Sequence, residues 1–455
     1  MSIRVVRVLS LACIVGGASP ARAQVVTATS AEPATSAEPA TSADDAGGWG
    51  AFEDAASAAT PTKIFETRVY GYLDSYFAFE VNWPAGLSPT NEILRESFPY
   101  EFDVLSAHVM VQGSILGRFR YFLNFAAVGL GSSSQDVALG VRNAWVETSL
   151  VGDHVVFRLG KTYRRFGLYN EILDATPTFI GVEAPEYLDP TGPITTRTTN
   201  LMLHGKLFST DDWTASWALM TGNDERTSDA FPIGADLRAT WRSMLTLGSS
   251  FYWTGGDAVS GTAFGDGAPN GGVKPWMDRD EYFVIGGFAQ LNWSGLIFQA
   301  EALYARHDAT RNADAVRRLA TSARFDATRP GRFFVDGDPA KGPAPLDVTY
   351  DVFTTYFRLG YSLHVSDVEL VPYIGATYYA NPETIADETF GGYVDGAGSK
   401  DGGDFVKSML GVVIRPVQQV ALKLETTSHF YRYGGQFDWH QEGKLSLSYL
   451  WDLGI

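Results

Sequence analysis

Three basic residues lie close together in this chain, at the point where a strand-like run ends and a long polar segment begins. Lys161, Arg164 and Arg165 come at and just after the end of the alternating run Phe157–Lys161. The segment then continues to Pro193, turns acidic and is interrupted by prolines; its acids include Glu171, Asp174, Glu183 and Glu186. Charged side chains gathered on one segment can bind ions or bias their passage. We therefore take 157–193 as the candidate functional segment.

The sequence offers no constellation that indicates catalysis. It contains no His-Glu-x-x-His, no Gly-x-Ser-x-Gly and no phosphate-binding Gly-Lys-Ser/Thr loop. Gly160-Lys161-Thr162 matches only the tail of the last motif and stands at a strand end. Cys13 is the single cysteine and falls in a predicted leader, so thiolate chemistry is excluded from the mature chain. We expect no enzyme activity, no cofactor and no metal site.

The N-terminal region has the layout of an exported protein. Residues 1–23 combine Arg4 and Arg7, an apolar core and Ala21-Arg22-Ala23, which predicts a signal peptide. Residues 24–62 repeat Thr-Ser-Ala-Glu-Pro-Ala, a composition that cannot form a core and indicates a disordered linker. Removing the leader takes away three arginines and no acid, so the net charge falls from −17 to −20. Such acidity argues against nucleic-acid binding.

From residue 63 to 455 the chain alternates apolar and polar residues in segments of about ten. This is the pattern of strands that have one face towards an apolar phase and the other towards water. An even number of such segments, about sixteen, is typical of bacterial membrane barrels. The predicted strands are Phe65–Phe79, Phe102–Ile115, Arg118–Gly131, Val137–Leu150, His154–Lys161, Asn200–Phe208, Trp213–Thr221, Ala235–Trp241, Leu245–Thr254, Tyr282–Trp293, Leu296–His307, Val352–Leu363, Val368–Tyr379, Phe405–Arg415, Val420–Tyr431 and Lys444–Leu453.

The connections between these strands alternate between short and long. Short ones include Val151–Asp153 and Pro416–Gln419, and long ones include Thr162–Thr199, Asp308–Asp351 and Arg432–Gly443. In outer-membrane barrels, short periplasmic turns alternate in this way with long extracellular loops. The sequence therefore predicts an all-β, transmembrane antiparallel β-barrel of about sixteen strands in the outer membrane of a Gram-negative cell. Its third long loop, which includes the candidate segment, is expected to fold inward.

If the apolar face of each strand meets lipid, the opposite face lines the interior. Arg or Lys in hydrocarbon would cost about 2–4 kcal/mol near the midplane, so strand parity is informative. Parity places bases and acids together in a lumen that we expect to be water-filled. The bases are Arg68, Arg120, Arg158, Lys206, Arg238, Arg358, Lys407 and Lys423; the acids are Glu66, Asp74, Asp236, Glu301, Glu369 and Glu425.

A short motif carries a family resemblance. The run Phe157-Arg158-Leu159-Gly160-Lys161, followed by Phe166-Gly167-Leu168, resembles the start of the inward loop in phosphate- and polyphosphate-selective porins. The resemblance implies a homotrimer of sixteen-stranded channels for small anions, over roughly 65–455. The candidate segment departs from that family's basic path, because it becomes acidic after Arg165. The resemblance therefore predicts a porin without predicting phosphate specificity.

Together these patterns predict a porin for passive diffusion of small hydrophilic solutes or ions, with a slight lean to anions such as phosphate. The basic residues expected at the pore are Arg158, Lys161, Arg164, Arg165, Arg68, Arg120, Lys206, Arg358 and Lys423; Glu171, Asp174, Glu183 and Glu186 are the acids expected on the constriction loop. The partners expected are outer-membrane lipid, lipopolysaccharide and two further copies of the chain. The alternative is a barrel with an enzymatic or a structural, adhesive role.

Overall fold

The computed structural model describes most of the region in which strands are predicted. The described residues are 65–87, 93–96, 100–128, 138–170, 180–182, 184–185, 197–223, 231–257, 277–313, 339–341, 346–383, 404–433 and 436–453. The proposed leader and linker lie outside them, so both stay predictions. Within the described residues, no helix has the length and apolar character needed to cross a membrane.

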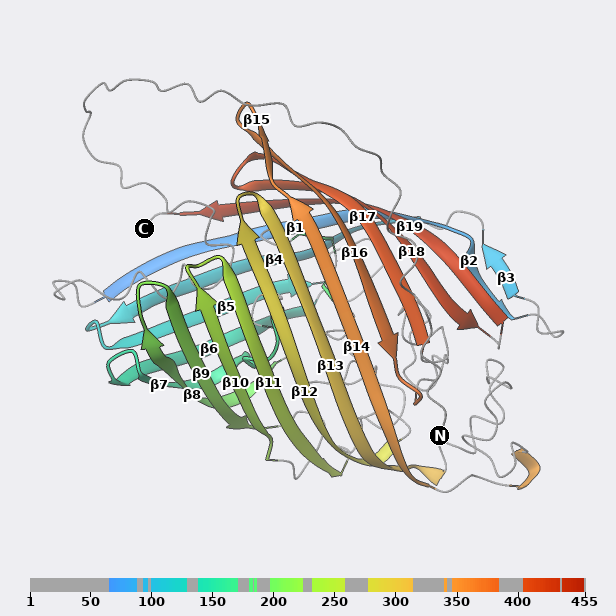
Figure 1. Ribbon diagram of the computed structural model, residues 1–455, viewed down its shortest axis with the longest axis horizontal. Coiled ribbons are helices and arrows are strands. Elements are labelled where there is room, and N and C mark those ends of the chain that lie inside the picture. The colour runs from blue at the N-terminus through green and yellow to red at the C-terminus, as the bar shows by residue number, and fades with distance from the viewer. Residues whose placement is uncertain are drawn as a thin grey trace. The chain divides into compact units, whose positions relative to one another are not determined.

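Long strands make up almost all of the described chain, and successive strands lie side by side (Figure 1). They are β1 (Phe65–Val81), β2 (Trp83–Leu87), β3 (Ile93–Glu96), β4 (Tyr100–Ile115), β5 (Phe119–Val128), β6 (Ala138–Val151), β7 (Val155–Tyr163), β8 (Arg197–Ser209), β9 (Trp213–Gly222), β10 (Ile233–Trp241), β11 (Leu245–Asp257), β12 (Met277–Trp293), β13 (Leu296–Arg311), β14 (Asp347–Tyr361), β15 (Leu363–Val365), β16 (Val368–Ala380), β17 (Asp404–Val417), β18 (Val420–Tyr433) and β19 (Gln436–Asp452). A 3₁₀ turn, η4, spans Pro339–Lys341.

The main sheet closes on itself. Each strand pairs antiparallel with the next along the chain, and β1 pairs with both β4 and β19, which leaves no free edge. The pieces β14 and β15 are separated only by Ser362 and both pair with β16, so they act as one strand. The result is the all-β, antiparallel barrel of sixteen strands that the alternation predicts.

The two faces of the strands differ as strand parity predicts. On β1, the side chains of Leu73, Phe77 and Phe79 are exposed on the outside, whereas Tyr72 and Asp74 are buried inside. The same alternation recurs on other strands of the described sheet, for example Leu445, Leu447 and Tyr449 exposed against Ser446 and Ser448 buried on β19. Because side chains alternate along a strand, each strand gives the barrel an apolar outer face and a polar inner face.

Short turns join the strands at one end of the barrel. Leu116-Gly117, Arg242-Ser243 and Ser294-Gly295 each place two consecutive residues at positive φ, between 48° and 86°. Two such residues are characteristic of type I′ turns, whose twist matches that of the flanking strands. These turns fall at three of the short connections predicted from the sequence, so those three predictions are confirmed.

One predicted connection is wrong. The segment Arg432–Gly443 was expected to be a long loop, but β18 runs to Tyr433 and β19 begins at Gln436. Polar residues that suggested a loop instead lie on the inner face of β19, for example buried Asp438 and His440, which alternate with exposed Phe437 and Trp439. The connection between β1 and β4 is long, as the alternation predicts, and it contains a small two-stranded sheet, β2 with β3, that was not predicted.

Candidate functional site

The segment that follows β7 lies inside the barrel. Arg164–Asn170 and Ile180–Val182 are buried apart from the half-buried Arg165, and they contact inward-facing residues of strands from β9 to β18. The chain can take this course because Tyr163 ends β7 and no ladder partner holds the residues after it. The inward folding predicted for this loop is therefore confirmed for its described residues, which we call the inner segment.

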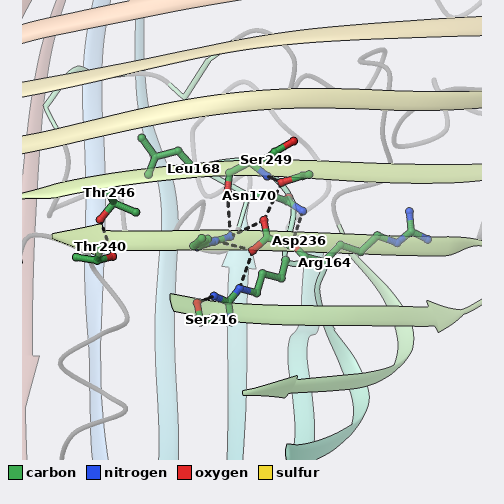
Figure 2. Close-up of polar contacts among 12 residues, drawn as sticks. Arg164, Leu168, Asn170, Ser216, Asp236, Thr240, Thr246 and Ser249 are labelled. Carbon is green, nitrogen blue, oxygen red and sulfur yellow. Dashed lines mark hydrogen bonds and ion pairs between the residues drawn. The ribbon is translucent and has the colours of Figure 1, made fainter. Parts of the chain in front are cut away.

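The first attachment of the inner segment is centred on Asp236 of β10. Its carboxylate accepts hydrogen bonds from Arg165 at 3.0 Å, from Arg238 at 2.7 Å and from Ser250 at 2.7 Å. Figure 2 shows Asp236 at the centre of this network. Ser216, on the neighbouring strand β9, accepts a hydrogen bond from Arg165. Ser250 in turn accepts from the backbone N–H of Gly167 at 2.9 Å.

Arg164 is not placed as an ion-binding residue on an open wall. Its side chain is buried over the ring of Tyr252, with the guanidinium carbon 4.3 Å from the ring centroid. Its Nη2 donates to the carbonyl of Asn223 at 3.3 Å, and its own carbonyl accepts from Asn170 at 2.8 Å. A guanidinium stacked on an aromatic ring is held electrostatically as well as by packing. Arg164 therefore fixes the start of the inner segment.

The second attachment is made by Leu168 and Tyr169. The backbone N–H of Leu168 donates to Glu301 of β13 at 3.4 Å. The Tyr169 hydroxyl donates to Gln299, and its ring meets that of Tyr356 edge to face with centroids 5.6 Å apart. Such aromatic pairs are favourable beyond the area that they bury.

The third attachment lies on β14 and β18. Arg358 donates to the carbonyl of Ile180 at 2.7 Å, and Lys423 donates to the carbonyl of Gly181 at 3.0 Å. The N–H of Val182 donates to the Glu425 carboxylate at 3.2 Å. Two bases predicted to line the pore, Arg358 and Lys423, therefore bind the chain's own backbone.

A separate charged cluster lies on β5–β8. Glu147 accepts from Arg120 at 2.6 Å and from Arg158 at 2.8 Å, and His204 lies 3.1 Å away. The guanidinium of Arg158 also stacks on Trp145 at 4.1 Å. We call Arg120, Glu147 and Arg158 the wall cluster; it holds two permanent positive charges against one carboxylate, and the Arg120 side chain is 31% exposed.

Three other bases predicted at the pore lie elsewhere. Arg68 pairs with Asp452 near the chain's C-terminal strand end, at 2.5 Å. Lys206 pairs with Asp153 at the β6–β7 turn, and this hydrogen bond lowers the pKa of the exposed Asp153 carboxyl. By register Lys161 lies opposite Ala144, on the face of β7 opposite to that of Arg158. This register does not support Lys161 as a residue of the interior.

The acids predicted for the constriction loop lie outside the described residues. These are Glu171, Asp174, Glu183 and Glu186. Their role in any constriction remains a prediction.

One polar group, towards the long-loop end of the interior, was not predicted from the sequence. His307 lies 3.0 Å from Asp280 and is stacked between Tyr282 and Tyr350, with centroids 4.7 and 4.5 Å away. Arg311, assigned to a loop from the sequence, belongs to β13 and pairs with Glu383 at 2.5 Å. Strand parity extended to the true strand ends would have found these residues. Among the residues that the structure describes, no group of three or more His, Cys, Asp or Glu could hold a metal ion.

The interior charges differ from expectation in one respect. Parity placed Asp236, Arg358 and Lys423 on the inner face correctly, but we expected them to be solvated in an open lumen. All three are buried and bound to hydrogen-bonding partners. Leaving such groups without partners would cost several kcal/mol each, so a segment folded across them can be held firmly.

Comparison with known proteins supports the fold. No protein-family model matches the sequence, and no curated protein matches it either. The structure is similar to the outer-membrane channel DcaP of Acinetobacter baumannii, with a TM-score of 0.51 and 10% identity over 87% of this chain and 100% of that one. This likeness shows that the chain shares the β-barrel fold of that outer-membrane channel.

Two further solved structures resemble the chain at lower scores. They are an anion-selective porin from Comamonas acidovorans (TM-score 0.48, 10% identity, 85% of this chain and 100% of that one) and the trimer form of OmpT from Vibrio cholerae (0.47, 12%, 86% and 100%). The resemblance to phosphate-selective porins stays a prediction.

Proposed function

We propose that this protein is an outer-membrane porin for passive diffusion of small hydrophilic solutes or ions. One observation carries the proposal: the closed barrel exposes large apolar side chains outside and gathers charged ones inside. In water, exposed apolar surface costs about 25 cal/mol per Å², so such an outer face suits lipid. Charged groups inside would bring water with them, and a segment folded across the interior would narrow the remaining path.

The same proposal gives the barrel an orientation and partners. The short turns face the periplasm and the long connections face outward, towards lipopolysaccharide. The chain forms a homotrimer, as the family resemblance implies, and the mass of the protein in detergent tests this. We propose no catalytic role and no cofactor.

A slight preference for anions follows from the wall cluster. Arg120 and Arg158 carry one positive charge more than Glu147 neutralises, and the Arg120 side chain is partly exposed. Fixed charges along a pore bias the passage of ions of the opposite sign. Small anions, phosphate among them, are therefore the favoured solutes.

Planar-bilayer recording of the purified, refolded protein tests this function. We expect stepwise conductance in symmetrical KCl and, in a salt gradient, a reversal potential displaced towards that of chloride. A clear cation preference would refute the anion lean while leaving the channel intact.

A structural or adhesive barrel is the second candidate. The observation that favours it is that several interior charges, such as Asp236, Arg358 and Lys423, are buried and paired. Absence of conductance from correctly folded protein would reject the porin and favour this role or an enzymatic one.

A further inference from the structure

We propose that Arg358, Lys423 and Glu425 set the largest solute that passes, because they fix the position of the inner segment at Ile180–Val182. They are positioning residues and do not select solutes by charge. This inference rests on the proposed channel function. The bases predicted to line the pore thus fall into two groups, one that positions the inner segment and one that leaves exposed charge on the wall.

Three consecutive residues of the inner segment are held through their backbone. Arg358 binds the carbonyl of Ile180, Lys423 binds the carbonyl of Gly181, and Glu425 accepts from the N–H of Val182, at 2.7, 3.0 and 3.2 Å. Hydrogen bonds to charged groups are about twice as strong as neutral ones. Because the partners are backbone atoms, the three bonds fix where the chain runs as well as which side chain it presents.

An apolar contact fixes the same point. Ile180 is 3% exposed and packs in a cluster that includes Val371, Tyr373, Met409 and Val413, from β16 and β17. The Tyr373 hydroxyl donates to Glu425 at 2.8 Å, so the apolar pocket and the polar bonds share a residue. The inner segment is therefore attached to the wall of β14–β18 by both kinds of interaction.

Gly181 shows how closely the attachment fits. Its φ of +100° is a conformation that side chains disfavour. A Cβ atom there would also lie 2.8 Å from the Arg358 guanidinium nitrogen. Any larger residue at 181 must displace Arg358 or the backbone, so this position tests the attachment without changing a charge.

Burial explains why these bases should not select ions. Arg358 is 2% exposed and Lys423 is 0% exposed, whereas the Arg120 side chain of the wall cluster is 31% exposed. Glu425 lies within the same attachment and partly neutralises the two bases. A solute can approach Arg120. The inner segment covers Arg358 and Lys423, so a solute contacts the segment and not these two bases.

The test compares five variants in two measurements, and the fifth is the conservative variant Lys423→Arg. Lys423→Met and Gly181→Ala weaken the attachment, Arg120→Met removes the exposed charge of the wall cluster, and Arg242→Met removes a turn arginine that pairs with Asp212 as a matched control. Swelling of proteoliposomes in sugars of increasing size measures the size limit. Reversal potential in a KCl gradient measures charge selectivity.

We expect Lys423→Met and Gly181→Ala to admit larger sugars and to raise conductance, with little change in reversal potential. Lys423→Arg, which keeps a donor, should retain the wild-type size limit more closely. Arg120→Met should move the reversal potential towards cations and leave the size limit unchanged. Arg242→Met should change neither measurement.

A Lys423→Met variant that shifts the reversal potential like Arg120→Met, with an unchanged size limit, would overturn the inference. If Lys423→Met does not fold, judged by heat-modifiable mobility in SDS gels, Gly181→Ala decides alone, and a wild-type size limit there also overturns it. A wild-type protein without conductance or swelling defeats the proposed function instead, so the two failures are distinguishable.

Discussion

The effect of each charged side chain inside this barrel depends on the groups to which it is bound. Glu147 is buried between Arg120 and Arg158, and Asp236 is buried between Arg165 and Arg238. Both carboxylates would be costly to bury alone. The difference lies in the arginines: Arg165 belongs to the inner segment, whereas both arginines of the wall cluster belong to the barrel wall. Two groups of similar composition therefore act differently: the one at Asp236 attaches the inner segment, and the wall cluster leaves a net positive charge.

Glu147→Gln should separate the stability of the wall cluster from its effect on ions. Breaking a buried ion pair costs about 3–5 kcal/mol, and we expect the low end because Arg120 is partly exposed. The urea midpoint of unfolding should therefore fall. Because two arginines then lack a carboxylate, the reversal potential should move further towards that of chloride.

Asp153→Asn is the matched control for that substitution. Asp153 pairs with Lys206 at an exposed turn, where ion pairs contribute about 0–1 kcal/mol. Its unfolding midpoint and reversal potential should both stay near those of the wild type. An equal shift in both variants would show that position in the wall cluster is irrelevant.

Among the elements, the strands and the inner segment are built by different rules. Each strand presents alternate residues to two phases, so its sequence pattern is enough to assign its faces. The inner segment has no such period and is positioned by contacts with strands from β9 to β18. The wall cluster lies on β5–β7.

Leu237→Arg tests the lipid-facing side of a strand. Leu237 lies in the middle of β10, is 53% exposed and lies opposite Trp217 and Ser249 on neighbouring strands. Arginine near the bilayer midplane should destabilise the barrel by about 2–4 kcal/mol in a lipid-based unfolding titration. Asp211→Arg, in an exposed turn, should change stability by no more than about 0.5 kcal/mol. Equal effects would argue that the outer face of β10 does not meet lipid.

At the scale of the whole molecule, closure of the sheet determines what the barrel can be. Pairing of β1 with both β4 and β19 satisfies the backbone of the first and last strands, as a spanning sheet requires. The ends of the barrel are also distinct, because tight turns join the strands at one of them. The protein should therefore have a fixed orientation in the outer membrane.

Single cysteines can test that orientation, because the mature chain is expected to contain none. A bulky maleimide that cannot cross the outer membrane should label Lys341→Cys, in η4 between β13 and β14, on intact cells. Asp367→Cys, in the turn before β16, should react only after the membrane is permeabilised. The reverse pattern would show that the short turns face outward.

Much of the fold could be predicted from the sequence because the strand period is local. Asp74, Glu301 and Glu425 are predicted to lie inside from alternation alone, and all three are buried on the inner face. The prediction was wrong at Arg432–Gly443, where polar interior residues of β18 and β19 looked like a loop. Polar composition marks a barrel interior as readily as it marks a connection.

The sequence by itself determined the barrel, its order of strands and the face of most of the charges on its strands, because these depend on residues close together in the chain. Only the tertiary structure decided which charges find partners. Lys423 reaches the carbonyl of Gly181 across 242 positions of sequence, and Arg358 reaches Ile180 across 178. Such contacts depend on how the inner segment packs in three dimensions, and no local period records them. For that reason the bases that looked like an anion path proved in part to be attachments for the inner segment.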